Sequence, residues 1–382
     1  MSTTTAKEES FQQQVSNAKT LEELLIHSKK VGVDKEDQLM VLKELLHQAV
    51  ALEFATIPIY LSAMWAIKDN NCEVAKSIRN IFQEEMLHMS MVCNMLVGIG
   101  GQPKIYTAEN RLSYPSGLPG DVHPHLFLYL EGFNDCSLRN FMEIELPDEI
   151  ADIYDYDTGE KDGLDELCGI HDHQPGKNSN EHFQNYNSTI GEMYDQINAL
   201  FHVLQPDMNV ERQLSGPLAW FVMADADSVS KAIKFIKEQG EGSENVTPAS
   251  TGMDNLAHFY RFWEIYYKKK IVEEKGKFFF KDPYPRPESY KIARIPKGGY
   301  LEGNVSAETW FLLHEFDKTY SELVMLLEDA WTEGGGGQAS LIKGIDVMFQ
   351  LEKYALPLMN TPIPKNQSGE HYGPCFRIID LD

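Results

Sequence analysis

Residues 78–95 read IRNIFQEEMLHMSMVCNM, and this stretch decides how the rest of the chain is interpreted. Its apolar residues recur at alternating steps of three and four, which is the spacing of one face of an α-helix. Glu85 and His88 lie at the middle of that apolar face. A carboxylate on a buried face is unfavourable unless a hydrogen bond, an opposite charge or a metal ion compensates it. The pattern therefore predicts a buried helix whose Glu-x-x-His pair either binds a metal or hydrogen-bonds within the core.

A second long helix is predicted over residues 36–68, with Asp34 as its N-cap. Glu53 lies at the centre of its apolar stripe, and Pro58 predicts a kink close to this carboxylate. The turn at residues 69–71 is short, so the two helices are expected to be antiparallel neighbours. Glu53 can therefore approach the Glu-x-x-His pair.

Two further helices are predicted over residues 180–204 and 253–270. Glu192 lies at the edge of the apolar stripe of the first, where a solvated charge is the alternative interpretation. His258 lies on the second, where a hydrogen-bonded structural histidine is the alternative. Amphipathic helices at about 307–332 and 339–359 follow, so the sequence predicts a mainly all-α protein.

These four helices offer a set of acids and imidazoles in places where apolar residues are expected: Glu53, Glu85, His88, Glu192 and His258. Ferritin-like carboxylate metal sites take one Glu from each of two helices and a Glu-x-x-His pair from each of the other two, and this chain resembles that inventory. Carboxylates with few imidazoles and no thiolate suit iron, with manganese as the alternative.

The fourth predicted helix departs from this inventory at one position. Asn255 stands where a Glu is expected, three residues before His258. Asp254 lies one residue earlier, away from the expected position. Asp195, one turn after Glu192, could compensate for the missing carboxylate. A single iron, or two unequal sites, is therefore as consistent with the sequence as a symmetric pair.

A second group of histidines lies in a loop-like stretch rich in Asp, Gly, Asn and Pro: His171, His173 and His182. Alternate residues of a loop need not converge, so the alternatives are a second metal cluster and a solvated loop. Residues 125–133 could form a short strand, and residues 138–147 a short helix or an extended segment.

Composition restricts the partners of this 382-residue chain. The formal net charge is -24, which disfavours nucleic acid and anionic membrane surfaces because both would be repelled. The segment MSTTTAKEESFQQQ lacks the apolar run of a signal peptide, and the five cysteines form no CxxC pair. We expect a cytoplasmic protein with reduced thiols and no membrane span, and the sequence leaves a homo-oligomer open.

A closer resemblance rests on eight segments in matching order, of which the first two and AHFYRF are the most specific. They are LLHQAVALEFATIPIYLSAMW at 45–65, EEMLHM at 84–89, GIGGQP at 98–103, LPG at 118–120, FMEIELP at 141–147, IGEMYDQI at 190–197, AHFYRFWEI at 257–265 and GPCFRI at 373–378. Over roughly residues 36–380 the chain resembles the ferritin-like family that includes the iminophenyl-pyruvate dimer synthases of violacein and rebeccamycin biosynthesis.

This resemblance implies a ferritin-like four-helix bundle with a long irregular crossover between its second and third helices. The expected division is a mobile N-terminus over 1–20, a bundle over 21–274 with the crossover at 100–180, and a C-terminal helical extension over 275–382 packed on the bundle. The resemblance implies metal ligands at the five acids and imidazoles named above, and oxidative chemistry on an amino-acid-derived small molecule. Members of this family differ in activity, so coupling of two imines of aromatic 2-oxo acids does not carry over directly.

Three functional hypotheses follow. The first is a non-haem iron oxidoreductase that uses O₂ or peroxide, with Tyr60 and Arg261 supporting the ligands or orienting the substrate. For Arg261 the alternative is an ion pair with Glu264 or Glu85. The second is a ferritin-like metal-binding or storage protein without an organic substrate. The third is a bundle whose acids and histidines only hydrogen-bond one another.

Overall fold

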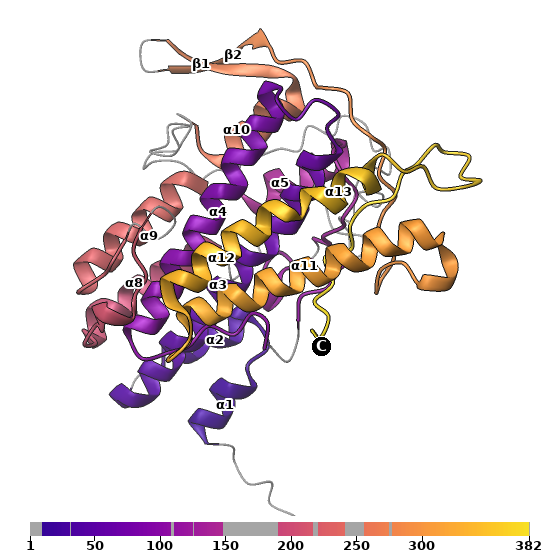
Figure 1. The fold of residues 1–382 in the computed structure, drawn as a ribbon. Helices are drawn as coiled ribbons and strands as arrows, with labels where there is room; N and C mark the ends of the chain where they lie inside the picture. The colour runs from indigo at the N-terminus through magenta and orange to yellow at the C-terminus, as the bar shows by residue number, and fades with distance from the viewer. Residues whose placement is uncertain are drawn as a thin grey trace, which may run out of the picture.

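The computed structural model describes residues 10–30, 32–107, 111–124, 126–147, 190–216, 221–240, 256–274 and 277–381. Helices dominate these residues, and a single two-stranded antiparallel sheet accompanies them (Figure 1). In chain order the elements are α1 Phe11–Asn17, α2 Leu21–Ser28, α3 Lys35–Ala66, α4 Glu73–Gly98, α5 Asp135–Ile144, α8 Ile190–Leu204, α9 Ala226–Gly240, α10 His258–Tyr267, β1 Lys269–Glu274, β2 Lys277–Pro283, α11 Ala307–Trp331, α12 Gly337–Gln350 and α13 Glu352–Met359.

The centre of the protein is the pair α3 and α4. The Asp34 side chain accepts a hydrogen bond from the backbone N–H of Asp37 and caps α3, as the sequence predicts. Pro58 is accommodated inside α3 without ending it. Residues 49–66 of α3 are almost entirely buried, because neighbouring elements cover this helix on every side. Any charged side chain in this segment must therefore find its partner inside the protein.

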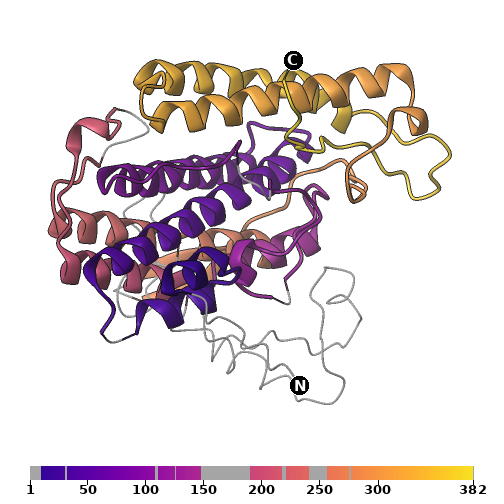
Figure 2. The same cartoon turned by 90° about the horizontal axis from the view of Figure 1, so that it is seen from below.

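Two layers cover the central pair on opposite faces. Figure 2 shows α11 and α12 on one side of α3 and α4, with α8, α9, α10 and α5 on the other. α8 packs against α3 and α9, while α5 packs against α10. α10 in turn packs against α4, so α5 and α10, more than 100 residues apart in the sequence, lie together on this side of the bundle. The protein is an all-α bundle with one added layer.

Several elements differ from the sequence predictions. α1 begins with a capping box at Ser10, so part of the expected mobile N-terminus is helical. Residues 126–133 form no strand, and only an isolated bridge joins Leu128 to Ser116. α9 was not predicted, although Val229, Ile233 and Ile236 form its buried face. The predicted helical start at residue 180 lies outside the described residues, as does the part of the expected 100–180 crossover that follows residue 147.

The C-terminal segment ties the outer layer to the bundle. The ring of Phe376 stacks on Trp65 of α3 and packs edge-on against Phe316 of α11. Asp317 is fully buried and accepts hydrogen bonds from the backbone N–H of Arg377 at 3.0 Å and from its Nε at 2.6 Å. These contacts involve the GPCFRI segment, so this motif has a structural role in holding the extension.

Two expectations about the environment need correction. Cys72, Cys93 and Cys375 are free thiols, but Cys136 is disulfide-bonded, which contradicts five reduced cysteines. α3 is long and apolar enough to cross a membrane, contrary to the expectation that no segment is. Its most apolar window is 94% buried inside the bundle, which is the situation of a core helix. A cytoplasmic location stays a prediction.

Candidate metal centre

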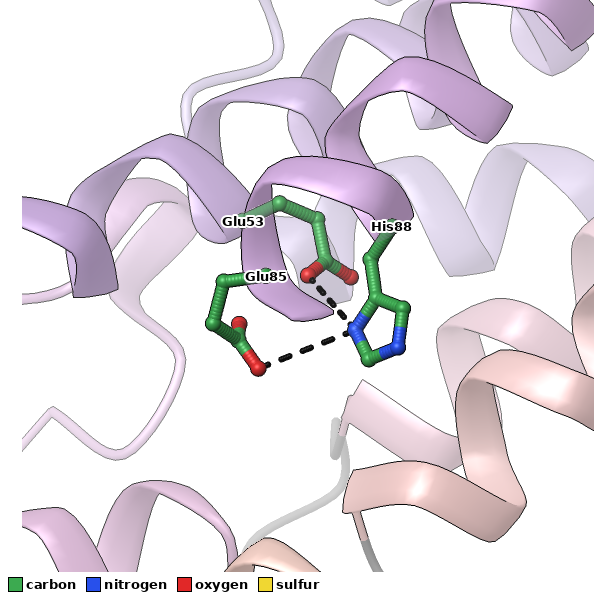
Figure 3. A group of neighbouring side chains, drawn as sticks. All are labelled: Glu53, Glu85 and His88. Carbon is green, nitrogen blue, oxygen red and sulfur yellow. Dashed lines mark ion pairs between the residues drawn. The ribbon is translucent and has the colours of Figure 1, made fainter. Parts of the chain in front are cut away.

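Three of the predicted residues meet at the contact between α3 and α4. The Nδ1 atom of His88 lies 3.5 Å from Oε2 of Glu53 and 3.7 Å from Oε1 of Glu85. Figure 3 shows the three side chains pointing toward one another. All three are buried, because the stripes that carry them face the core of the bundle. One ligand atom from each lies within 4.8 Å of the others, which is close enough to share one metal ion.

His258 brings a second imidazole to the same place. It is the first residue of α10, and its ring is fully buried. Its Nδ1 lies 2.8 Å from Oε1 of Glu85 and 3.4 Å from Oε2 of Glu145. Glu85, Glu145 and His258 form a second group of donors within 4.8 Å of one another. The two groups share Glu85, so they are adjacent positions of one site.

Glu145 is the functional residue that sequence reasoning missed. It is the C-cap of α5, directly after the last helical residue Ile144. Its carboxylate occupies the place for which a Glu at position 255 was expected, and Asn255 itself lies outside the described residues. In the segment FMEIELP this acid stands between Ile144 and Leu146, but Glu143 stands between apolar residues too, so the sequence does not single it out. Glu145 at the end of α5 thus supplies the carboxylate that the fourth predicted helix lacks.

Each donor group contains one carboxylate besides the shared Glu85, and a tyrosine hydroxyl hydrogen-bonds to each of these two carboxylates. Tyr60 donates a hydrogen bond to Oε1 of Glu145 at 2.6 Å, and Tyr194 donates one to Oε1 of Glu53. Tyr60 is fully buried and lies against the rings of Phe141 and Phe262, which fix its orientation. Tyr60 therefore supports a ligand from behind and does not face a substrate.

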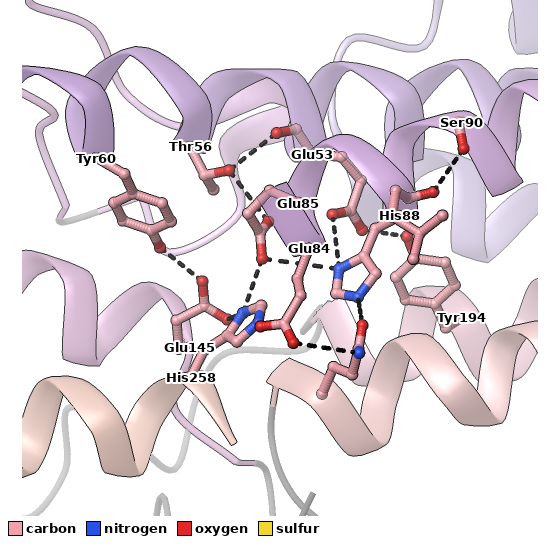
Figure 4. A network of polar contacts seen from close by, with 12 residues as sticks. Glu53, Thr56, Tyr60, Glu84, Glu85, His88, Ser90, Glu145, Tyr194 and His258 are labelled. Atoms are coloured by element: carbon pink, nitrogen blue, oxygen red, sulfur yellow. Dashed lines mark hydrogen bonds and ion pairs between the residues drawn. The ribbon is translucent and has the colours of Figure 1, made fainter. Parts of the chain in front are cut away.

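The far nitrogen of each histidine has its own partner, as Figure 4 shows for this network. Nε2 of His258 lies 3.1 Å from Oε2 of Glu84, and Nε2 of His88 lies 2.7 Å from Oε1 of Gln239 on α9. Arg261 forms a buried ion pair with Glu84. This pairing differs from both partners considered in the sequence analysis and makes Arg261 a support for the site.

These contacts shift the protonation equilibria in a consistent way. Burial and the charge of Glu145 raise the pKa of Glu85 to about 7, although the hydrogen bond with His258 opposes them. Burial also disfavours the charged form of Glu84, but the hydrogen bonds and charges of His258 and Arg261 outweigh it and lower its pKa to about 2. For His258, burial favours the neutral ring, yet the surrounding carboxylates raise its pKa well above the usual range. The metal-free site thus holds protons that a cation would displace.

The donor set fits a divalent metal ion. Glu84 is ionised and can only accept hydrogen bonds, so Nε2 of His258 carries a proton and its Nδ1 can present a lone pair. That Nδ1 atom is buried, and carboxylate oxygens of Glu85 and Glu145 face it at 2.8 and 3.4 Å. A lone pair directed at carboxylates needs a cation between them, either a proton or a metal. Carboxylates and imidazoles without thiolate suit iron or manganese.

A cavity of about 50 Å³ lies against the donors. Its lining includes Glu53, Glu85, His88 and Glu145, together with apolar side chains from four helices and the loops beside them: Leu52, Leu118, Ile144, Leu146, Ile190 and Ile236. A buried water needs roughly 10–15 Å³ of such space, so a few small molecules can lie beside the donors. The donors are therefore buried beside a small space that side chains leave unfilled.

Glu192 is the predicted ligand that the structure does not bring into the site. Its carboxylate lies 2.6 Å from Nζ of Lys29 at the surface, and its side chain is 36% exposed. Asp195, considered as a substitute, pairs with Lys237 at 2.9 Å. Both acids lie on the outer side of α8, whereas Tyr194 of the same helix points inward. The prediction of Glu192 as a ligand is not supported.

The second histidine group cannot be placed. His171, His173 and His182 lie outside the described residues, as does Asp254.

The fold and the site define a ferritin-like helical protein with donors for metal. A family model described as Ferritin-like matches residues 46–267, which is more than half of the chain, and the chain belongs to this family. Among solved structures, a ferritin-like protein from Caulobacter vibrioides is similar, with a TM-score of 0.53 and 17% identity over 84% of this chain and 94% of that one. At that identity the similarity concerns the fold alone. No curated protein matches the sequence.

Proposed function

We propose that this chain is a metal-dependent oxidoreductase that oxidises an amino-acid-derived small molecule with O₂ or peroxide as the co-substrate. Iron, as one or two ions, is the proposed cofactor, and manganese is the alternative. The observation that carries the proposal is the buried pair of donor groups sharing Glu85 beside a cavity. Bound iron would supply the redox chemistry that side chains lack.

The residues of this chain would hold and shield such a cofactor. Glu53, Glu85 and His88 would bind at one position, and Glu145 and His258 would complete the other with the shared Glu85. The apolar cavity lining would limit access of water to the site. Coupling of imines derived from aromatic 2-oxo acids, as in the synthases that the motifs resemble, is the specific reaction proposed for testing.

The alternative function is metal binding or storage without an organic substrate. The cavity next to Glu53 supports the proposed enzyme, because it leaves space at the donors for a small co-substrate such as O₂ or peroxide. A storage protein would take up many ions per chain, whereas the described donors can accommodate two at most. The stoichiometry of bound iron therefore separates the two functions.

The test is anaerobic loading with Fe(II), followed by exposure to O₂. We expect no more than two iron ions per chain by elemental analysis and a change in the near-ultraviolet and visible spectrum after O₂ is added. Glu85→Ala should abolish both, because it removes the carboxylate that the groups share. Glu192→Gln is the matched control and should behave like the wild type. Absence of bound metal and of any spectral change in the wild type would exclude this function.

A further inference from the structure

The two donor groups have different partners behind their histidines. His258 is backed by the carboxylate of Glu84, whereas His88 is backed by the side-chain amide of Gln239. A carboxylate that accepts the far N–H of a ligating histidine makes the near nitrogen a stronger donor, and a neutral amide does so less. The imidazole of His258 is therefore the better metal ligand of the two.

The orientation of the Gln239 amide is determined by its neighbours. Its Nε2 lies 3.4 Å from Oε1 of Glu84, which can only accept a hydrogen bond, so its Oε1 must face Nε2 of His88. His88 then carries its proton on Nε2 and directs Nδ1 toward Glu53 and Glu85. The ionised Glu84 thus keeps a proton on Nε2 of His258 by direct contact, and on Nε2 of His88 by orienting the amide of Gln239.

The two donor groups also differ in how many of their members reach the cavity. Every member of the Glu53, Glu85 and His88 group lines the cavity. Of the other group, Glu85 and Glu145 line it, but His258 is not part of the lining and has no exposed surface. An ion beside His88 would therefore be the one that small molecules reach first.

We propose that the two positions have different roles, and this inference rests on the proposed function. The Glu85, Glu145 and His258 position, backed by Glu84, holds its ion tightly and is filled first. The Glu53, Glu85 and His88 position, backed by Gln239, binds more weakly, exchanges its ion and faces the cavity. Glu84 and Gln239 are the positioning residues that create this difference. Outer partners of ligands typically change metal affinity by 10–100-fold, so the two dissociation constants should differ by at least tenfold.

The test is a titration of the metal-free protein with Mn²⁺, followed by calorimetry and by electron paramagnetic resonance. The wild type should bind two ions in resolved steps. Gln239→Met removes the acceptor from His88 while retaining the chain volume, so it should weaken the second step about tenfold and leave the first unchanged. Glu84→Gln should weaken the first step more than the second, because Glu84 contacts His258 directly and His88 only through Gln239, so the two steps should move closer together.

Each outcome has a defined meaning. Two steps of equal affinity in the wild type, or a weakened first step in Gln239→Met, would overturn the assignment of roles while leaving the metal site intact. Complete absence of Mn²⁺ binding in the wild type would instead overturn the proposed function. Glu84→Gln leaves Arg261 without its buried charge partner, so thermal unfolding of each variant is measured first. If this variant does not fold, Gln239→Met alone decides.

Discussion

The metal-free protein should lose stability as the pH rises from 5 to 8, and Glu85 should account for much of the loss. Its pKa is about 7 in the folded protein against a usual value of 4.5, because burial and the charge of Glu145 disfavour ionisation. Between these two values the folded state binds more protons than the unfolded state, so the free energy of unfolding falls as the pH rises. At about 1.4 kcal/mol for each tenfold change in proton affinity, the loss is on the order of 3 kcal/mol above pH 7.

The other groups of the site do not oppose this trend. The pKa values of His88 and His258 are raised: burial alone would lower them, but the carboxylates around them outweigh it. The stability that they contribute is complete below the unfolded value of about 6.5 and is lost as the pH rises through the folded value. Glu84, with a pKa of about 2, contributes stability above 4.5 that is lost only as the pH falls toward 2. Its contribution is therefore constant between pH 5 and 8.

The assay is urea unfolding of the metal-free protein at four pH values from 5 to 8. Glu85→Gln removes the ionisable group, so the variant should be more stable than the wild type at pH 8 and should show a flatter pH profile. Glu192→Gln, an exposed acid on α8, is the matched control and should follow the wild type. A wild-type stability that is constant or rises between pH 5 and 8, or a Glu85→Gln profile parallel to it, would refute the reasoning.

Three further predictions concern single contacts. Tyr194→Phe removes the hydroxyl that donates to Glu53, so Mn²⁺ affinity at the weaker step should fall about tenfold by calorimetry; an unchanged affinity would contradict this. Arg377→Met leaves the buried Asp317 carboxylate without its charge partner, although the backbone N–H of residue 377 stays, and should lower the free energy of unfolding by about 3–5 kcal/mol in urea. Adding Asp317→Asn should recover part of that loss, and no recovery would argue against the ion pair as its cause. Glu192→Gln should leave the Mn²⁺ stoichiometry unchanged, and loss of an ion would restore this residue as a ligand.

Periodicity identified those site residues that interrupt an apolar stripe. Glu53, Glu85 and His88 stand on long buried helices, where three- and four-residue steps fix the face on which each side chain lies. The helical fold was predictable for the same reason, and the family match and the similar solved structure confirm it. His258 was also identified from its face of a shorter helix.

The remaining site residues depend on tertiary packing. Glu145 follows the end of a short helix in a region with many prolines, so no periodic pattern marks it as inward-facing. Gln239 lies on α9, where the apolar face was available in the sequence but an amide gives no signal of a role at a metal site. Glu192 shows the opposite error. Its edge position on α8 indicated a solvated charge, and only the expected ligand inventory argued for a buried one.

The account depends on one claim, that donors from α3, α4, α5 and α10 meet at a two-position site that shares Glu85. The most direct test is anomalous diffraction from crystals of the protein soaked in Mn²⁺. We predict two anomalous peaks, each in contact with Glu85, with His88 beside one and His258 beside the other. No peak at Glu85, or a peak at Glu192 in its place, would contradict the account.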